Sequence, residues 1–388
     1  MEKKILVVAG EASGDLHAAH LIQHLKKINP NTRFYGLGGK NMKAAGVDID
    51  FDLTNLAVVG FIEILKHYSL FKKIFERILE KTKNEKPDAA ILIDYPGFNL
   101  RLAKELKKMG VPVIYFISPQ VWAWGRKRIK FIRDTISLML VLFKFEETLY
   151  KDGKFNVKFI GHPLLDIVRP AKSRQSLLSE TGFKENFKTI SLLPGSRNRE
   201  VTNHLPVMLE AAQRIFKDSP NTQFFICRAS TVGREIYKTI IEKAKIDFPY
   251  RLLDDQTYEG INASELVIVA SGTATLETAI LNKPMVIIYK LSTLTWILAR
   301  LFVKIPDIGL VNVVAGQRIV PELIQFSANA KNIAQTSLRL LKDKARQEKI
   351  HAELYALKNT LGIPGAYNRA AQEISKFLKI PNEPSGPS

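Results

Sequence analysis

The chain has 388 residues, of which 46% are hydrophobic and 24% are charged, and its formal net charge is +19. This composition excludes a disordered chain, and the length is typical of two domains. No apolar run approaches the roughly 18–20 residues that a membrane-spanning helix needs, and a single cysteine, Cys227, excludes an internal disulfide. We therefore expect a cytoplasmic protein whose positive charge attracts nucleic acid, anionic lipid or phosphorylated ligands.

The N-terminal half alternates apolar segments with helical patterns. Continuous apolar strands that are separated by helices of about ten residues or more predict a parallel sheet covered on both faces. The predicted strands are Lys4–Ala9, Thr32–Gly36, Ala89–Asp94, Val111–Ser118 and Leu138–Phe143, and the predicted helices are Asp15–Ile28, Leu100–Met109 and Arg126–Arg133.

The same alternation restarts after Arg169–Lys188, which we interpret as a polar linker. Strands are predicted at Thr189–Leu193, Thr222–Cys227, Tyr250–Leu253, Leu266–Ala270 and Pro284–Tyr289, and a helical region follows at about Ala328–Lys379. The predicted class is α/β, with two Rossmann-like, doubly wound domains that face each other across a cleft. We place them at 1–168 and 169–360, followed by a C-terminal helix and tail at 361–388. Ligands of such sheets bind where the strands end.

The stretch Ser191–Val201 combines a strand, a glycine turn and the start of a helix. Free N–H groups and the helix dipole at such a turn favour an anion. Gly195 and Ser196 supply the turn, and Arg197 and Arg199 add cations that can grip a phosphate. The pattern matches neither a Walker loop nor a Gly-x-Gly-x-x-Gly turn. We interpret it as a pyrophosphate cradle.

A second turn of this kind contains Ser271, Gly272 and Thr273, and Glu277 follows about one helical turn later. Its hydroxyls and N–H groups are predicted to face the same ligand. Glu277 is a candidate acceptor for a ribose diol, as the acid of dinucleotide folds is.

Two turns of the N-terminal half also carry polar candidates. Ser13, Gly14 and Asp15 follow the first strand and are predicted to hold a sugar hydroxyl or phosphate, or else to form a plain turn with Asp15 as a helix cap. Asp94 ends a buried strand, where burial raises the proton affinity of a carboxylate toward that of a general base. The alternative is that Asp94 only organises the Pro-Gly turn after it.

Two segments suggest contact with a membrane. Trp122 and Trp124 stand in a loop beside Arg126, a combination typical of membrane interfaces, although stacking on nucleic acid or core packing would use the same residues. The segment Phe61–Lys83 has an apolar stripe at helical spacing and a basic opposite side. It is predicted to face the core along most of its length, and a membrane surface is the alternative.

Two metal patterns are weak. His17, His20 and His24 share one helix face but lack an obvious fourth ligand, and Asp48–Asp52 contains only a short acidic repeat. We expect no metal site and no cofactor. Cys227 lies in an apolar strand and is predicted to be buried rather than a nucleophile.

Five stretches resemble those of one family in order and spacing, over roughly Lys4 to Gln325. They are Gly10–Asp15, Ser118–Trp124, Gly161–Pro163, Leu193–Arg197 and Ser271–Glu277. The sequence is similar here to lipid-A-disaccharide synthases. The resemblance implies an inverting, metal-independent GT-B glycosyltransferase that joins UDP-2,3-diacylglucosamine to 2,3-diacylglucosamine 1-phosphate (lipid X). The products would be the β-1,6-linked disaccharide 1-phosphate and UDP.

The resemblance also implies roles for single residues. Asp94 would take the proton from the acceptor 6-hydroxyl, and Arg197 with the N–H groups of Gly195 and Ser196 would stabilise the leaving UDP. Asn312 falls on a third important position, with an implied role in catalysis and in binding the UDP-sugar, after a valine where family members usually carry proline. The implied location is peripheral, on the anionic surface of the inner membrane, and a homodimer is left open.

Two other readings predict different behaviour. Another UDP-sugar GT-B enzyme would use a different lipid acceptor or, as a non-hydrolysing epimerase, no acceptor at all. A nucleic-acid-binding protein would bind generic DNA or RNA with a steep salt dependence, but the chain lacks a recognised nucleic-acid motif. We therefore expect no nucleic-acid partner.

Overall fold

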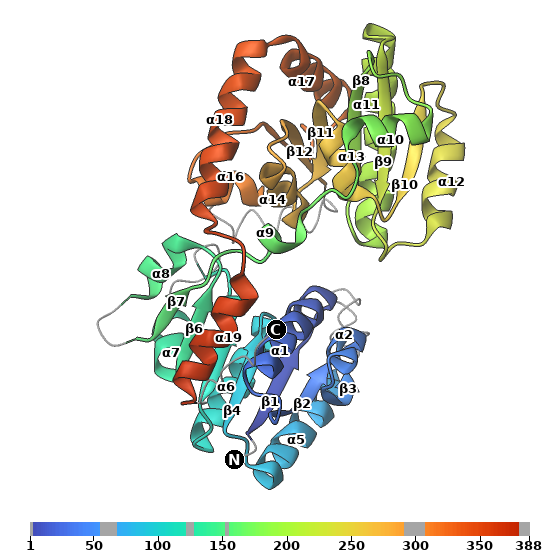
Figure 1. Cartoon of the computed structure of the whole chain (residues 1–388). Helices are drawn as coiled ribbons and strands as arrows, with labels where there is room; N and C mark the ends of the chain where they lie inside the picture. Colours follow the sequence, from blue (N-terminus) through green and yellow to red (C-terminus); the bar gives the residue numbers. More distant parts are fainter. Residues whose placement is uncertain (1–2, 55–67, 122–127, 152–154, 291–306, 380–388) are drawn as a thin grey trace. The chain divides into compact units, whose positions relative to one another are not determined.

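The computed structural model describes residues 3–54, 68–121, 128–151, 155–290 and 307–379 (Figure 1). The chain divides into two compact units. Unit 1 contains Met1–Leu165 and Leu361–Ser388, and unit 2 contains Asp166–Thr360. The C-terminal helix, for which we expected a separate segment, thus belongs to unit 1. None of the described helices is long and apolar enough to span a membrane.

Unit 1 is built on a parallel sheet of seven strands in the order β3-β2-β1-β4-β5-β6-β7. The strands are β1 (Lys4–Ala9), β2 (Arg33–Gly38), β3 (Asp48–Asp52), β4 (Ala89–Ile93), β5 (Val113–Phe116), β6 (Leu138–Val141) and β7 (Val157–Phe159). The five predicted strands are present, with ends that differ by at most two residues. The two outermost strands, β3 and β7, were not predicted.

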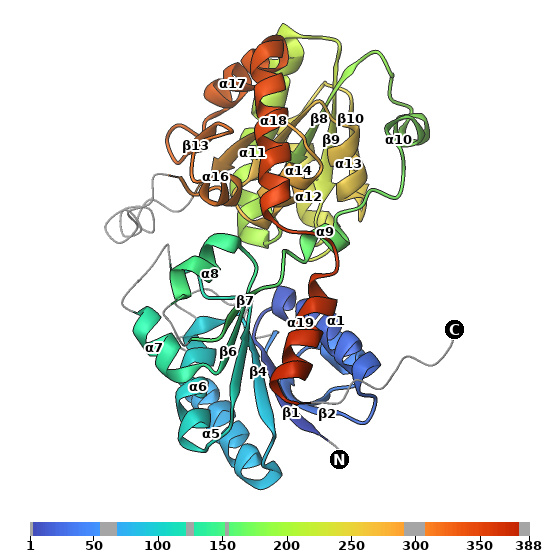
Figure 2. The ribbon, with the colours of Figure 1, turned by 60° about the vertical axis from the view of Figure 1, so that its left-hand side comes forward.

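Helices cover this sheet, and the last of them comes from the far end of the chain. They are α1 (Ala12–Ile28), α2 (Lys40–Ala44), α5 (Tyr68–Glu85), α6 (Pro96–Lys108), α7 (Arg128–Thr135), α8 (Lys144–Tyr150) and α19 (Ala366–Phe377), with α9 (Leu164–Ile167) at the boundary of the units. Figures 1 and 2 both show α19 lying against α1. α6 begins four residues earlier than predicted, because Pro96 fits the first helical position.

Unit 2 has a parallel sheet of six strands in the order β10-β9-β8-β11-β12-β13. They are β8 (Lys188–Leu193), β9 (Thr222–Arg228), β10 (Tyr250–Asp254), β11 (Leu266–Ala270), β12 (Met285–Tyr289) and β13 (Glu322–Ile324). The helices are α10 (Arg174–Thr181), α11 (Asn198–Asp218), α12 (Arg234–Ala244), α13 (Thr257–Ala263), α14 (Thr273–Ile280), α16 (Leu310–Ala315), α17 (Ala330–Lys342) and α18 (Lys344–Thr360).

The predicted linker is wrong in one respect. Within Arg169–Lys188 the chain forms α10, which packs on α13 and buries Leu177 and Leu178. Within α10 this apolar pair is surrounded by polar residues, so the periodicity was too weak to indicate a helix.

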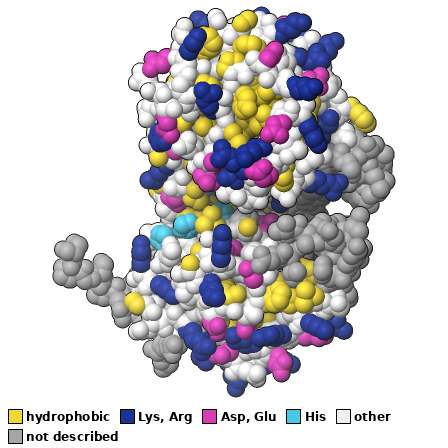
Figure 3. Space-filling model, turned by 90° about the vertical axis from the view of Figure 1, so that its right-hand side faces the viewer, with side chains coloured by type: hydrophobic (Ala, Val, Ile, Leu, Met, Phe, Trp, Pro, Cys, Tyr) yellow, Lys and Arg dark blue, Asp and Glu magenta, His cyan; other side chains and the backbone are white. Residues whose placement is uncertain are grey.

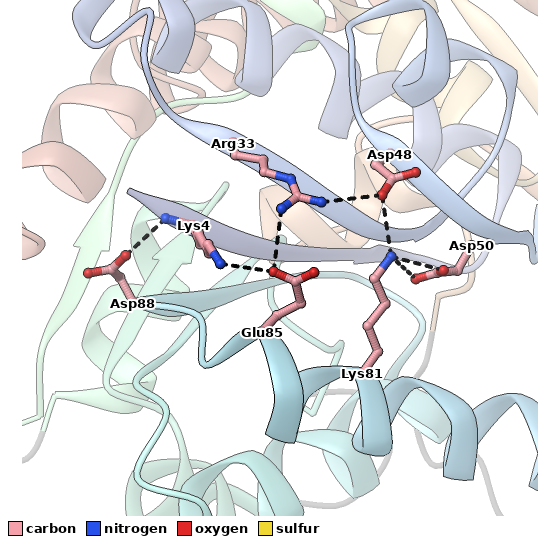
Figure 4. A network of polar contacts seen from close by, with 7 residues as sticks. All are labelled: Lys4, Arg33, Asp48, Asp50, Lys81, Glu85 and Asp88. Atoms are coloured by element: carbon pink, nitrogen blue, oxygen red, sulfur yellow. Dashed lines mark hydrogen bonds and ion pairs between the residues drawn. The ribbon is translucent and has the colours of Figure 1, made fainter. Parts of the chain in front are cut away.

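The amphipathic segment faces the core where it is described. Ile74 and Ile78 of α5 are buried, and Leu70, Phe71, Phe75 and Leu79 pack against the same apolar cluster. An ion-pair network at the amino ends of the strands holds the helix (Figure 4). In it Lys81 of α5 contacts Asp50 at 2.9 Å and Asp48 at 3.3 Å. The acidic repeat of β3 therefore pairs with a cation from α5.

Candidate active site

Three loops of unit 1 follow strands that are neighbours in the sheet. β1, β4 and β5 lie side by side, and Ala9 at the end of β1 is the register partner of Ile93 at the end of β4. The turns at Gly10, Asp94 and Ser118 therefore start at one edge of the sheet. This is the carboxyl edge, where ligands of such folds bind.

Asp94 occupies a strained turn between β4 and α6. Asp94 and Tyr95 both have a φ of 46°, a left-handed conformation that costs a non-glycine residue roughly 1–2 kcal/mol. Such strain persists only where the surroundings enforce it, and it concentrates at functional sites. Here the Asp94 carbonyl accepts hydrogen bonds from the Tyr115 hydroxyl at 2.6 Å and from Asn99 Nδ2 at 2.8 Å.

The carboxyl group of Asp94 has the proton affinity that a general base needs. Burial, and then the negative charge of Glu11, raise its pKa from 3.8 to about 6. A carboxyl group with this pKa is ionised at neutral pH and accepts a proton more readily than an ordinary aspartate. Glu11 belongs to the turn after β1. The turn after β1 therefore affects the pKa of Asp94 through the negative charge of Glu11.

Asp15, which we predicted to hold a sugar hydroxyl or phosphate or else to cap its own helix, has its carboxylate hydrogen-bonded inside unit 1. The side chain accepts backbone N–H groups from Gly39 at 2.7 Å, Asn41 at 2.9 Å and Met42 at 3.1 Å. Asp15 is 1% exposed. It therefore stabilises the N-terminus of α2, and it fixes the loop after β2 rather than capping its own helix.

Ser13 and Gly14 lie in the first turn of α1 and have different surroundings. Ser13 is exposed, whereas Gly14 is buried. A Cβ on Gly14 would lie 3.6 Å from the side chains of Ala9 and Ile93. Ser13 therefore offers its hydroxyl at the carboxyl edge, and Gly14 contributes to the packing of α1 on the sheet.

The cradle of unit 2 contains the expected glycine turn. Gly195 has a φ of +125°, and a Cβ there would lie 2.6 Å from Glu200 Cβ, so neither the backbone nor the space admits a side chain. β8 and β11 are neighbours, with Leu193 the register partner of Val269. The cradle and the Ser271–Glu277 turn therefore emerge at the same carboxyl edge.

The Glu200 carboxylate accepts hydrogen bonds from the same N–H groups that we predicted to bind a phosphate. Its Oε2 accepts the backbone N–H groups of Ser196 at 2.9 Å and Arg197 at 3.3 Å, and its Oε1 pairs with Arg197 Nη1 at 3.1 Å. A glutamate three residues into a helix that accepts the N-cap N–H is half of a capping box. The Arg197 side chain is 73% exposed, so this ion pair contributes little and can be exchanged for a phosphate.

His204, one turn further along α11, fixes the same loop. One ring nitrogen, Nδ1, lies 2.9 Å from the Pro194 carbonyl, and Nε2 lies 3.0 Å from the Lys290 backbone N. Because a backbone N–H only donates, Nε2 accepts from Lys290 and Nδ1–H donates to Pro194. Burial lowers the pKa of His204, which favours this neutral form. His204 therefore joins the loop after β8 to the chain after β12.

The second glycine turn of unit 2 joins β11 to α14. Gly272 has a φ of +153° and a Cβ there would meet nothing within 4 Å, while Thr273 is exposed. Ser271 Oγ donates to the Ile308 carbonyl at 2.9 Å. Gly272 and Thr273 are thus at the surface of the turn, and Ser271 ties it to the segment before α16.

Glu277 has an unusual protonation equilibrium. Burial raises its pKa from 4.5 to about 7, against the effect of a long hydrogen bond of 3.5 Å from the Tyr258 hydroxyl. Near neutral pH this carboxyl group accepts hydrogen bonds in its ionised form and donates one in its protonated form. Both are compatible with the predicted contact to a ribose diol.

Asn312 has no hydrogen-bonding capacity left for a ligand. It is 1% exposed. Its Nδ2 donates to the Val320 carbonyl at 2.9 Å and to Glu322 Oε1 at 2.7 Å, and its Oδ1 accepts from the N–H groups of Ile319 at 2.9 Å and Val320 at 3.1 Å. Val311 before it lies in the first turn of α16, where proline is also tolerated.

The predicted lipid-facing residues Trp122, Trp124 and Arg126 lie outside the described residues, and their role stays a prediction. Cys227 is buried in β9, as predicted, and burial raises the pKa of its thiol to about 12. That thiol is therefore not a nucleophile at neutral pH.

The histidines of α1 surround an aromatic ring of α19. The rings of His17, His20 and His24 lie 6.0, 5.0 and 6.0 Å from that of Tyr367, and His17 Nδ1 is 2.7 Å from the Tyr367 hydroxyl. Within the described part of the chain, no group of three or more His, Cys, Asp or Glu side chains could hold a metal ion. These histidines instead dock the C-terminal helix onto unit 1.

The fold matches solved structures over nearly its whole length. A putative UDP-N-acetylglucosamine 2-epimerase from Listeria monocytogenes superposes with a TM-score of 0.65 at 13% identity and 99% coverage of both chains. The calicheamicin glycosyltransferase CalG4 superposes with a TM-score of 0.61 at 14% identity, over 98% of this chain and 99% of that one. Two parallel-sheet units with glycine turns at their carboxyl edges thus define a protein of the GT-B fold class.

Sequence comparison gives the particular family. A family model described as lipid-A-disaccharide synthetase matches residues 5–376. A lipid-A-disaccharide synthase from Syntrophus aciditrophicus is 45% identical over 97% of this chain and 98% of its own length, and one from Nitrosococcus oceani is 42% identical over 97% of each. The chain belongs to the lipid-A-disaccharide synthase family.

Proposed function

We propose that this chain transfers 2,3-diacylglucosamine from its UDP derivative to the 6-hydroxyl of lipid X, with inversion at the anomeric carbon. The observation that carries the proposal is the half-buried carboxyl group of Asp94, whose pKa is raised to about 6 in a strained turn. Family membership supports the choice of donor and acceptor.

The proposed reaction is a single displacement. Asp94 takes the proton from the acceptor hydroxyl while the oxygen of that hydroxyl forms a bond to the anomeric carbon. The bond from that carbon to UDP breaks, and the electron pair leaves with the diphosphate. Attack from the opposite side inverts the configuration.

The donor half of the proposal rests on unit 2. Arg197 and the N–H groups of its loop are assigned to the diphosphate, where they stabilise the charge that grows as UDP leaves. Glu277 is assigned to the ribose, and Gly272 and Thr273 to the surface that the nucleotide covers. Because Arg197 supplies the positive charge, we expect turnover in the presence of a chelator.

We further propose that the protein associates peripherally with the anionic inner-membrane surface, where both acylated substrates reside. The net charge of +19 supports this association. On the face in Figure 3, Lys and Arg side chains occur on both units among fewer acidic ones. On α5, Lys72, Lys73 and Arg77 are exposed.

The test is a transfer assay with defined substrates. Purified protein receives UDP-2,3-diacylglucosamine and lipid X in the presence of EDTA, mass spectrometry follows disaccharide and UDP, and NMR defines the linkage. We expect one β-1,6 disaccharide per UDP, only when both substrates are present. Epimerisation of a UDP-sugar without lipid, or a strict requirement for a divalent ion, would contradict the proposal.

A further inference from the structure

We propose that Tyr115 and Asn99 are positioning residues for Asp94, which they hold in its left-handed conformation through its backbone carbonyl. The inference rests on the proposed function, in which Asp94 is the base. Neither residue was identified from the sequence, because one comes from the neighbouring strand β5 and the other from α6.

The backbone of Asp94 is held at both of its polar atoms. Its N–H donates to the Phe116 carbonyl at 3.1 Å, and its carbonyl accepts from the Tyr115 hydroxyl at 2.6 Å and from Asn99 Nδ2 at 2.8 Å. Two consecutive residues of β5 therefore hold the Asp94 backbone: Phe116 through its own carbonyl oxygen and Tyr115 through its side-chain hydroxyl. Asn99 Nδ2 also donates to the Ile93 carbonyl at 3.1 Å, which fixes the end of β4.

These contacts oppose a conformational preference. Asp94 and Tyr95 are consecutive non-glycine residues with a φ of 46°, a region that such residues rarely adopt. Without its two donors, the partly buried Asp94 carbonyl would lose both hydrogen bonds in a strained turn, and relaxation toward a right-handed conformation would be favoured. That relaxation would carry the carboxylate away from its present direction.

The two donors are themselves rigid. Tyr115 and Asn99 are both 0% exposed. Burial raises the pKa of the Tyr115 hydroxyl well above its usual value, so it remains a donor over the range in which enzymes are assayed. Base catalysis tolerates only small errors in position, since a displacement of about 1 Å can cost 100-fold in rate.

The test compares Tyr115→Phe and Asn99→Ala with Tyr35→Phe, which removes a hydroxyl from another fully buried tyrosine of the same sheet. We expect both test variants to lower kcat between about tenfold and 100-fold. The Kd for UDP should stay within about twofold, because the nucleotide is assigned to unit 2. Tyr35→Phe should keep the wild-type kcat.

The double variant tests whether the two donors act together. Its kcat should be only slightly lower than that of the worse single variant, because a carbonyl displaced by the loss of one donor is no longer in place for the other.

A second readout does not need turnover. In protein labelled with ¹³C-aspartate, the Asp94 carboxyl signal is identified by its loss in Asp94→Asn and titrated. We expect Tyr115→Phe and Asn99→Ala to lower its midpoint from about 6 toward the ordinary value of 3.8. Wild-type kcat and an unchanged midpoint in both variants would overturn the inference and leave the proposed function standing. If the wild type formed no disaccharide but the Asp94 midpoint still shifted in both variants, the proposed function would be overturned and the positioning role would stand.

Discussion

The carboxylate of Glu200 accepts the backbone N–H of Ser196 at 2.9 Å, and so holds a donor that we assign to the diphosphate of the substrate. The same carboxylate accepts the N–H of Arg197 and pairs with its guanidinium. A phosphate that uses these donors must displace Glu200. Glu200 therefore shapes the cradle and also competes with a diphosphate for its donors.

Removal of the charge at Glu200 should strengthen nucleotide binding. Glu200→Gln keeps an oxygen acceptor for the loop but no longer repels a diphosphate, so we expect the Kd for UDP to fall about threefold to tenfold, which corresponds to roughly 0.6–1.4 kcal/mol. Isothermal titration calorimetry measures it, with Glu210→Gln, an exposed residue of the same helix, as the control. Weaker binding or no change would mean that UDP does not use these donors.

Loss of His204 should weaken the cradle itself. In His204→Ala the Pro194 carbonyl and the Lys290 N–H lose a buried partner, and we expect UDP affinity to fall by about tenfold and stability by about 2–3 kcal/mol. Ile215→Val, at a buried position of the same helix, costs about 1 kcal/mol and should leave UDP affinity unchanged. If His204→Ala lost stability but bound UDP normally, the loop would not depend on this histidine.

The pH profile should report Asp94. Its pKa of about 6 predicts that kcat/KM rises with pH and levels off above about 7, because the base must be ionised. Glu11→Gln removes the neighbouring negative charge, so the midpoint should move to lower pH. A profile that is flat between about pH 5 and 8 would argue against Asp94 as the base.

Asp94 should also destabilise the folded enzyme at neutral pH. The folded state binds the Asp94 proton more tightly than the unfolded chain does, with a pKa of about 6 against 3.8, so stability falls as pH rises through this window. The full effect is at most about 3 kcal/mol. Asp94→Asn should therefore raise the Tm at pH 7.5 and change it little near pH 4. An equal effect at both pH values would mean that the cause is not this ionisation.

Asn312 should contribute to the stability of unit 2 rather than to UDP binding. Asn312→Ala removes four hydrogen bonds from a buried site, and we expect a loss of about 2–4 kcal/mol in the free energy of unfolding. UDP affinity of the folded fraction should stay within about threefold, about 0.65 kcal/mol. Normal stability with lost UDP binding would instead assign Asn312 to the ligand.

Local patterns predicted most of the fold. The central strands of both sheets are mostly apolar, and such runs indicate buried parallel strands. The exceptions are edge strands: β3 alternates acids with apolar residues, and β7 and β13 have three residues each. The docking of α19 could not be predicted, because Tyr367 contacts His17 across 350 positions of sequence.

The residues of the candidate site also fall into two groups, those that local sequence patterns indicate and those that depend on tertiary packing. Asp94 and the Gly195 turn could be proposed from the sequence because their signals are local: an acid at the end of a strand, and a glycine between a strand and a helix. Tyr115 and Asn99 act on Asp94 through strand order and helix packing, which sequence periodicity does not give. Glu200 could have been found, since a glutamate three residues after the N-cap is the spacing of a capping box.

The most direct test of the account is the amount of disaccharide formed by Asp94→Asn relative to the wild type, with UDP binding measured on the same samples. We expect the variant to bind UDP as the wild type does and its turnover to fall between about 100-fold and 10,000-fold, the range that general base catalysis contributes. Disaccharide formation at the wild-type rate by Asp94→Asn would contradict this expectation.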